Sequence, residues 1–298
     1  MIVSYTPSWR GIIAQIAIPI GIALGFSCLV VFLSFYGYRL FSIPDLSVSI
    51  VGAALVIFLG FRTNAAYARW WEARILWGAL VNQSRSWARQ VVAYTACEAA
   101  APVSGFAREM VHWQITYVHV LRLHLRRESF SALELPAGLP AGPLLERVNP
   151  PLAILQHMAL RIAEAAKNGL ITEFRLIALN QVLTELTNVQ GGCERIRNTP
   201  FPRQYDYYPG LFIQIYCVLL PLAVFDDVGL FTPLVTLIIA FSLLVIDQIG
   251  KNLEDPFSSI IHGIPMTALS RSIEIDLRQQ LGETDLPKPV EAVNGILA

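Results

Sequence analysis

Residues 12–35 read IIAQIAIPIGIALGFSCLVVFLSF and place the chain among membrane proteins. No charged residue occurs between Gly11 and Tyr38, and a helix of this length, rising about 1.5 Å per residue, crosses a hydrocarbon layer of about 30 Å. The apolar core of a cleavable signal peptide is shorter, roughly 7–15 residues, and no small-residue cleavage site follows this stretch. We therefore expect a transmembrane helix here.

Three further uncharged stretches approach spanning length, at residues 46–61, 207–225 and 229–246. Asp226 and Asp227 separate the last two, which predicts a helical hairpin. The whole chain of 298 residues is 54% hydrophobic and only 15% charged, against about 25% charged residues in a soluble domain. The sequence therefore predicts an all-α membrane protein with four transmembrane helices per subunit and argues against a soluble enzyme.

The remaining residues carry the charge and indicate aqueous helical parts. We expect four regions: residues 1–61 with transmembrane helices 1 and 2, a cytosolic helical domain at 62–203, transmembrane helices 3 and 4 at 204–247, and a cytosolic helix and tail at 248–298. Residues 133–151 contain five prolines and are expected to form a loop, and residues 266–281 an amphipathic helix. The two loops expected on the far side, residues 39–45 and 226–228, contain one basic residue, Arg39, and three aspartates, so 21 of the 22 Lys and Arg residues lie on the other side. The positive-inside rule then places both termini in the cytoplasm, as expected of a multi-pass protein of the cell inner membrane.

One stripe on the second predicted helix points to a pore. Ala53, Ile57 and Phe61 recur at intervals of four and therefore share a helix face. Such a stripe is commonly ordinary helix packing, but copies from several subunits would also form a hydrophobic constriction that gates by dewetting. Gly52 and Gly60 are expected to allow close approach of neighbouring helices.

A cluster of aromatic and charged side chains follows this helix. Arg69, Trp70, Trp71 and Glu72 are typical of a membrane interface, where aromatic rings anchor a helix and arginines mark its cytoplasmic end. We expect a structural role, with Glu72 pairing with Arg69 at i+3 and Arg62 extending toward water.

No catalytic or metal motif is present. His112, His119 and His124 have none of the spacings of a zinc site, and no phosphate-binding loop or nucleophile elbow occurs. Four scattered cysteines are expected to be buried small hydrophobic residues: Cys28, Cys97, Cys193 and Cys217. We therefore expect no enzyme activity, no metal and no cofactor. A net charge of 0, from 22 basic and 22 acidic residues, gives no nucleic-acid footprint.

Three motifs in order along the chain resemble the bestrophin family in its bacterial form. They are FLGFRTNAAYARWWEAR at residues 58–74, ERIRNTPFP at 194–202, and Asp247 followed by EDPF at 254–257. The resemblance implies a homopentameric ion channel with one axial pore. It also implies a hydrophobic neck at the positions of Ala53, Ile57 and Phe61, where Ala53 is smaller than the bulky residue typical of the family. A cytosolic aperture is implied at Phe201 and Pro202. The acidic run that clasps calcium in animal members is replaced by Ser258 and Ser259, so calcium activation is not expected.

These observations predict a passive channel for monovalent ions, cations or chloride, in contact with membrane lipid and with further copies of the chain. The acidic outer loops favour cations, whereas the bases on the inner side argue the other way, so the sign of the ion stays open. Two alternatives are a secondary transporter, which requires buried charges within its spans, and a membrane scaffold with a cytosolic partner-binding domain.

Overall fold

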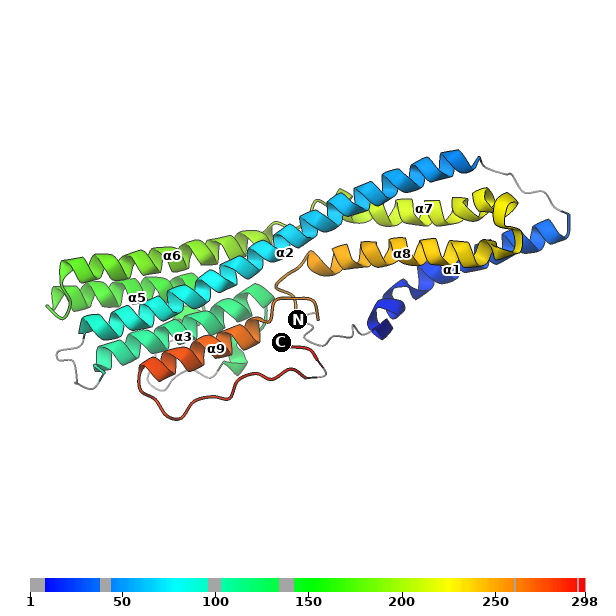
Figure 1. The fold of residues 1–298 in the computed structure, drawn as a ribbon. Helices are drawn as coiled ribbons and strands as arrows, with labels where there is room; N and C mark the ends of the chain where they lie inside the picture. Colours follow the sequence, from blue (N-terminus) through cyan, green and yellow to red (C-terminus); the bar gives the residue numbers. More distant parts are fainter. Residues whose placement is uncertain are drawn as a thin grey trace. The chain divides into compact units, whose positions relative to one another are not determined.

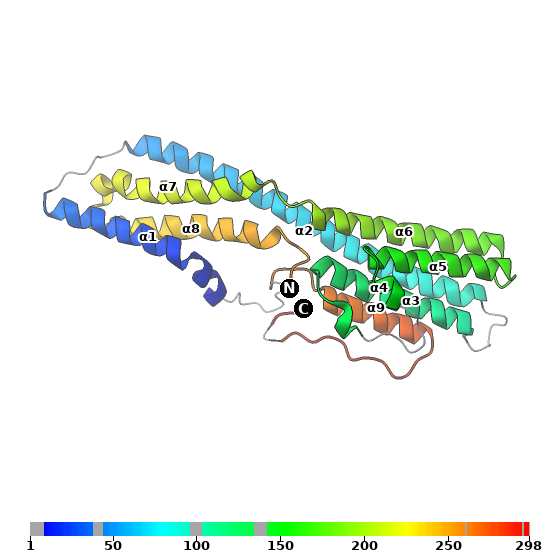
Figure 2. The same cartoon turned by 180° about the vertical axis from the view of Figure 1, so that it is seen from behind.

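The computed structural model describes residues 9–37, 44–95, 103–133, 142–259, 261–293 and 295–297. Within these residues the chain is helical, with an isolated bridge between Val293 and Ile296 and no strand. Figures 1 and 2 show the helices from two sides. The α-helices are α1 (Trp9–Phe35), α2 (Asp45–Thr95), α3 (Gly105–Arg126), α4 (Gly142–Leu145), α5 (Pro150–Lys167), α6 (Glu173–Asn198), α7 (Arg203–Val228), α8 (Thr232–Leu253) and α9 (Met266–Gln280), and the short 3₁₀ helices are η1 (Phe130–Ala132) and η2 (Gly229–Phe231).

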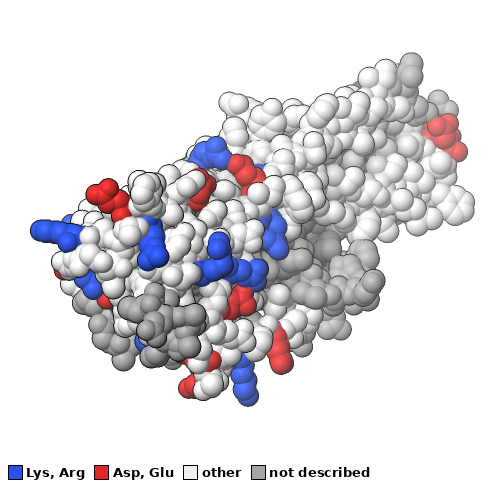
Figure 3. All heavy atoms as spheres, turned by 60° about the vertical axis from the view of Figure 1, so that its left-hand side comes forward, with Lys and Arg blue, Asp and Glu red and all other residues white. Residues whose placement is uncertain are grey.

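The helices divide into two compact units, which we describe separately. The apolar unit comprises Tyr5–Trp70 and Pro200–Asp255, and the charged unit comprises Trp71–Thr199 and Pro256–Ala298. Helix α2 contributes residues to both units. In the view of Figure 3 the charged side chains gather over the charged unit, while the visible surface of the apolar unit shows few of them.

The apolar unit consists of α1, the first half of α2, α7 and α8. Among the described residues, three helical segments are long and apolar enough to span a membrane: Ile13–Phe35, Ser47–Thr95 and Tyr207–Leu253, the last of which contains both α7 and α8. Helices α1, α7 and α8 pack closely on one another, and Val48, Leu55 and Leu59 of α2 join their core. Large apolar side chains also cover the outer surface, as expected of helices surrounded by lipid or by further subunits.

The sequence misplaced two boundaries. Asp226 and Asp227 do not form the hairpin turn, because α7 continues through them to Val228 and the chain turns at η2, where Gly229 adopts a φ of 55° that favours glycine. The predicted loop at 133–151 is also too long: α4 lies within it, and α5 already begins at Pro150, since proline is well accommodated in the first turn of a helix.

In the charged unit α3 is the central helix, packed against α5, α6 and α9 and buried on most of its faces. Two side-chain hydrogen bonds lie in this core: Trp87 Nε1 donates to the Met110 carbonyl at 3.1 Å, and Gln114 Nε2 donates to Ser84 Oγ at 2.9 Å. Helix α9 is amphipathic and buries Ile273 and Leu277, which confirms the amphipathic helix predicted there.

Candidate functional site

The predicted pore stripe lies on the outer face of α2. Ala53, Ile57 and Phe61 are exposed, with 60% of Ile57 and 70% of Phe61 accessible. The opposite face is buried against the same unit through Val48, Gly52, Leu55, Leu59 and Arg62. The stripe therefore faces away from the core of its own unit.

The two glycines of this helix have different surroundings. A Cβ atom at Gly52 would lie 2.6 Å from Tyr216 Oη and 2.9 Å from Tyr216 Cζ, so glycine is needed for α7 to approach. Gly60 lies on the exposed face, and no atom would lie within 4 Å of a Cβ there. Close helix approach is thus confirmed at Gly52 and does not occur within the subunit at Gly60.

A buried charge cluster joins α2 to α8, which the sequence reasoning missed. Arg62 is 1% exposed, so the expectation that it extends to water was wrong. Its Nη1 pairs with Asp247, and its Nη2 lies 2.6 Å from Glu254 Oε1. Asp247 also accepts from Lys251 Nζ at 2.9 Å. The signal was present in the sequence, because Arg62 and Asp247 each directly follow an uncharged stretch, at ends expected on one membrane face.

The expected ion pair in the motif after the stripe was wrong, and the structural role of the motif stays a prediction. Glu72 pairs with Arg195 of α6 instead of with Arg69. Arg69 Nε donates to the Glu254 carbonyl at 2.9 Å. The rings of Tyr67 and Trp70 stack with centroids 6.3 Å apart. Trp70 is half-buried, and Trp71 is 49% exposed.

Phe201 and Pro202 lie at the start of α7. Pro202 is the residue that precedes the first turn, and Phe201 is half-buried, with the Arg69 guanidinium carbon 5.9 Å from its ring centroid. This distance is within the range of a cation–π contact. Their role as an aperture stays a prediction.

The three histidines of α3 do not converge on one site. Each lies beside a different glutamate: His112 Nε2 is 3.2 Å from Glu283 Oε1, His119 Nε2 is 3.0 Å from Glu274 Oε2, and His124 Nε2 is 3.8 Å from Glu194 Oε1. Burial lowers the pKa of His112 below its usual 6.5, against the opposing effect of Glu283. Within the described ranges no three His, Cys, Asp or Glu side chains are grouped to hold a metal ion.

The cysteines follow the sequence prediction in part. Cys193 and Cys217 are buried, Cys28 is exposed, and Cys97 lies outside the described residues. Burial raises the pKa of Cys193 to about 12, so its thiol is unreactive at neutral pH.

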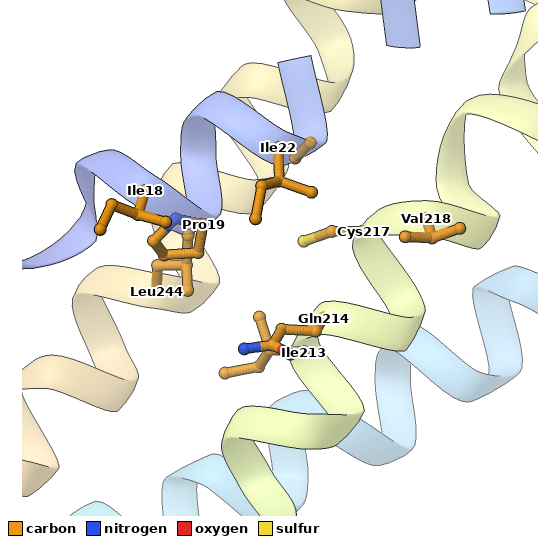
Figure 4. A pocket seen from close by; sticks show the side chains of 9 residues that line it. Ile18, Pro19, Ile22, Ile213, Gln214, Cys217, Val218 and Leu244 are labelled. Atoms are coloured by element: carbon orange, nitrogen blue, oxygen red, sulfur yellow. The ribbon is translucent and has the colours of Figure 1, made fainter. Parts of the chain in front are cut away.

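An apolar cavity of about 250 Å³ lies between α1, α7 and α8. Figure 4 shows Pro19 and Ile22 of α1 on one side and Cys217 of α7 on the other, with the Gln214 amide as the polar group of the lining. No α2 residue lines it. The cavity is therefore separate from the outer stripe and has no charged group that could bind an ion.

Comparisons with known proteins agree with one another. Residues 3–279 match the family model described as bacterial/fungal bestrophin protein. The voltage-dependent anion channel-forming protein YneE of Escherichia coli K12 is 36% identical over 246 residues, which cover 81% of this chain and 78% of that protein. The similarly named RSc3414 of Ralstonia nicotianae is 35% identical over 242 residues, covering 80% of this chain and 78% of its own. The crystal structure of a bestrophin homologue from Klebsiella pneumoniae matches with a TM-score of 0.81 at 28% identity, covering 90% of this chain and 99% of that one.

Proposed function

Because the chain belongs to the bacterial and fungal bestrophin family, we propose that this membrane protein is a passive ion channel built from five copies around one axial pore. The observation that carries the proposal is the exposed apolar stripe Ala53, Ile57 and Phe61, which faces away from the subunit core. Five such stripes around an axis form a narrow apolar neck that ions cross only after losing part of their hydration shell. The channel names of the E. coli and R. nicotianae relatives support the same function.

The proposed topology has four spans, with α7 and α8 as separate crossings. Residues 62–203 and 248–298 then lie in the cytosol with both termini, at the inner membrane, as the distribution of basic residues favours. Phe201 and Pro202 form a second constriction in this arrangement. The cation–π contact of Phe201 with Arg69 supports a fixed ring at that position.

The neck carries no charge, so the sign of the ion does not follow from it. The names of the relatives favour anions, whereas the acidic pair Asp226 and Asp227 at the end of α7 favours cations. A bi-ionic reversal potential in planar bilayers decides between them. A shift toward the chloride equilibrium potential assigns an anion channel, and a shift toward the sodium or potassium potential assigns a cation channel.

Replacing Ile57 and Phe61 together by alanine tests the neck. The double variant should raise single-channel conductance, because it removes the apolar side chains that narrow and dry the pore. The matched control is Leu234→Ala with Ile238→Ala on α8, a pair with the same spacing that is 53% and 57% exposed. The neck assignment would be refuted by an unchanged current in the α2 variant or by equal current changes in the α2 and α8 variants. It would also be refuted if the unmodified protein were monomeric in detergent.

A secondary transporter is the second candidate, and the Arg62–Asp247 cluster favours it, because buried charges near the end of a span are typical of coupled transport. The two mechanisms differ in kinetics. A channel gives unitary currents that grow with driving force, whereas a transporter gives flux that saturates with substrate and requires a second ion.

A further inference from the structure

The buried charge cluster lies beside the proposed neck but does not line it. Phe61 and Arg62 are adjacent in α2, yet Phe61 is 70% exposed while Arg62 is 1% exposed. At about 100° per residue, Arg62 points about 100° from Phe61 and about 140° from Ile57. We propose that Arg62 is a positioning residue that fixes the rotation of α2 about its own axis and so keeps the stripe turned toward the pore. This inference rests on the proposed function.

The contacts of Arg62 allow few orientations of α2 about its own axis. Its two terminal nitrogens contact different carboxylates, Asp247 and Glu254, which are seven residues apart at the end of α8. Seven residues are about two helical turns, so both partners lie along one side of α8. A planar guanidinium that satisfies both carboxylates at once has a defined direction, and rotation of α2 would break at least one contact.

A second arginine on the same face of α2 also restricts the orientation of the helix. Arg69 follows Arg62 by seven residues and donates from Nε to the Glu254 carbonyl at 2.9 Å. Lys251 compensates the remaining charge on Asp247 at 2.9 Å. Two points of attachment, two turns apart along α2, restrict both the rotation and the sliding of the helix against the end of α8.

The other contacts of α2 in this unit provide less direction. Helices α1, α7 and α8 pack closely on one another, and α2 approaches α7 closely at Gly52, where a Cβ would lie 2.6 Å from Tyr216 Oη. It joins their core through the apolar side chains of Val48, Leu55 and Leu59. Apolar burial is non-directional and tolerates rotation, while the charged hydrogen bonds of Arg62 and Arg69 do not. The ion cluster therefore supplies the charged, directional contacts that select the outward face of α2, alongside the close approach at Gly52.

The test uses cysteines introduced singly at Ile57, on the stripe, and at Leu55, on the buried face. Modification by a charged thiol reagent is measured on the purified oligomer by mass, so the readout does not depend on ion flux, and the chain with its native cysteines is the reference. With Arg62 present, position 57 should react and position 55 should not. In the Arg62→Met background this preference should be lost.

Two further variants separate positioning from stability. Arg62→Met leaves the buried Asp247 and the partly buried Glu254 without their shared partner and can prevent folding. Arg62→Met is therefore also combined with Asp247→Leu and Glu254→Gln, because uncharged replacement of a buried cluster is commonly tolerated. If Arg62 sets the rotation, the triple variant assembles but shows a weaker preference for position 57 than the reference, with the bond of Arg69 to the Glu254 carbonyl as the remaining attachment. If the triple variant keeps the wild-type pattern, the inference is wrong.

The control is Arg85→Met, on the same helix as Arg62. It removes an exposed ion pair with Asp276 of α9 and should leave the thiol modification pattern unchanged. An equal loss of preference in this control would also overturn the inference. A reference protein that shows the expected pattern but conducts no ions would refute the proposed function and leave the positioning role of Arg62 intact.

Discussion

Replacing Gly52 by alanine should destabilise the apolar unit, whereas the same change at Gly60 should not. Both glycines lie in the apolar first half of α2, eight residues apart, and local sequence pattern predicts the same role for each. In the structure a Cβ at Gly52 would lie 2.6 Å from Tyr216 Oη and 3.0 Å from Tyr216 Cε2, while a Cβ at Gly60 would contact nothing. Tyr216 is 7% exposed, so its ring has little room to move aside.

The expected magnitude is the difference between two effects. Overpacking at a close contact costs about 1–3 kcal/mol. Removing glycine from a helix interior returns up to about 1 kcal/mol. The Gly52→Ala variant should therefore lose up to about 2 kcal/mol of unfolding free energy, and the Gly60→Ala variant should be unchanged or gain up to about 1 kcal/mol.

The measurement is thermal unfolding of both variants in one detergent, where about 1 kcal/mol corresponds to roughly 2–4 °C in a domain of 150–250 residues. Adding Tyr216→Phe to Gly52→Ala removes the nearest atom of the clash and should restore part of the loss. Equal melting temperatures for the two alanine variants, or no recovery with Tyr216→Phe, would show that α7 does not approach α2 at Gly52.

Two further predictions concern the charged unit and calcium. Because burial lowers the pKa of His112 below 6.5, the folded chain binds fewer protons than the unfolded chain, and its stability should fall as the pH drops below 6.5. The His112→Gln variant should therefore show unfolding midpoints that depend less on pH between pH 7.5 and 5. An unchanged dependence of the midpoint on pH would contradict the assignment. Because Phe257 is followed by Ser258 and Ser259 instead of an acidic run, chelating calcium should leave ion flux unaltered in liposomes, and loss of flux in chelator would show a calcium site that the sequence does not reveal.

Much of the candidate site could be predicted from periodicity. The interval of four between Ala53, Ile57 and Phe61 fixes a common helix face whatever surrounds the helix, and the structure shows that this face is exposed. The partners of charged residues could not be predicted in this way. Glu72 is three residues from Arg69 but pairs with Arg195, because spacing along a helix shows which pairs can form and not which competing partner lies closer.

The amino-acid sequence determined the class of protein, the apolar helices and the stripe on α2, because helix formation in a membrane depends on hydropathy and local spacing. Only the tertiary structure decided that Arg62 is buried, that Gly52 rather than Gly60 admits a neighbouring helix, and that the histidines of α3 have separate partners. These features depend on contacts between residues far apart in the chain, such as Arg62 with Asp247, 185 positions later. Packing selects such contacts from many that local pattern allows equally.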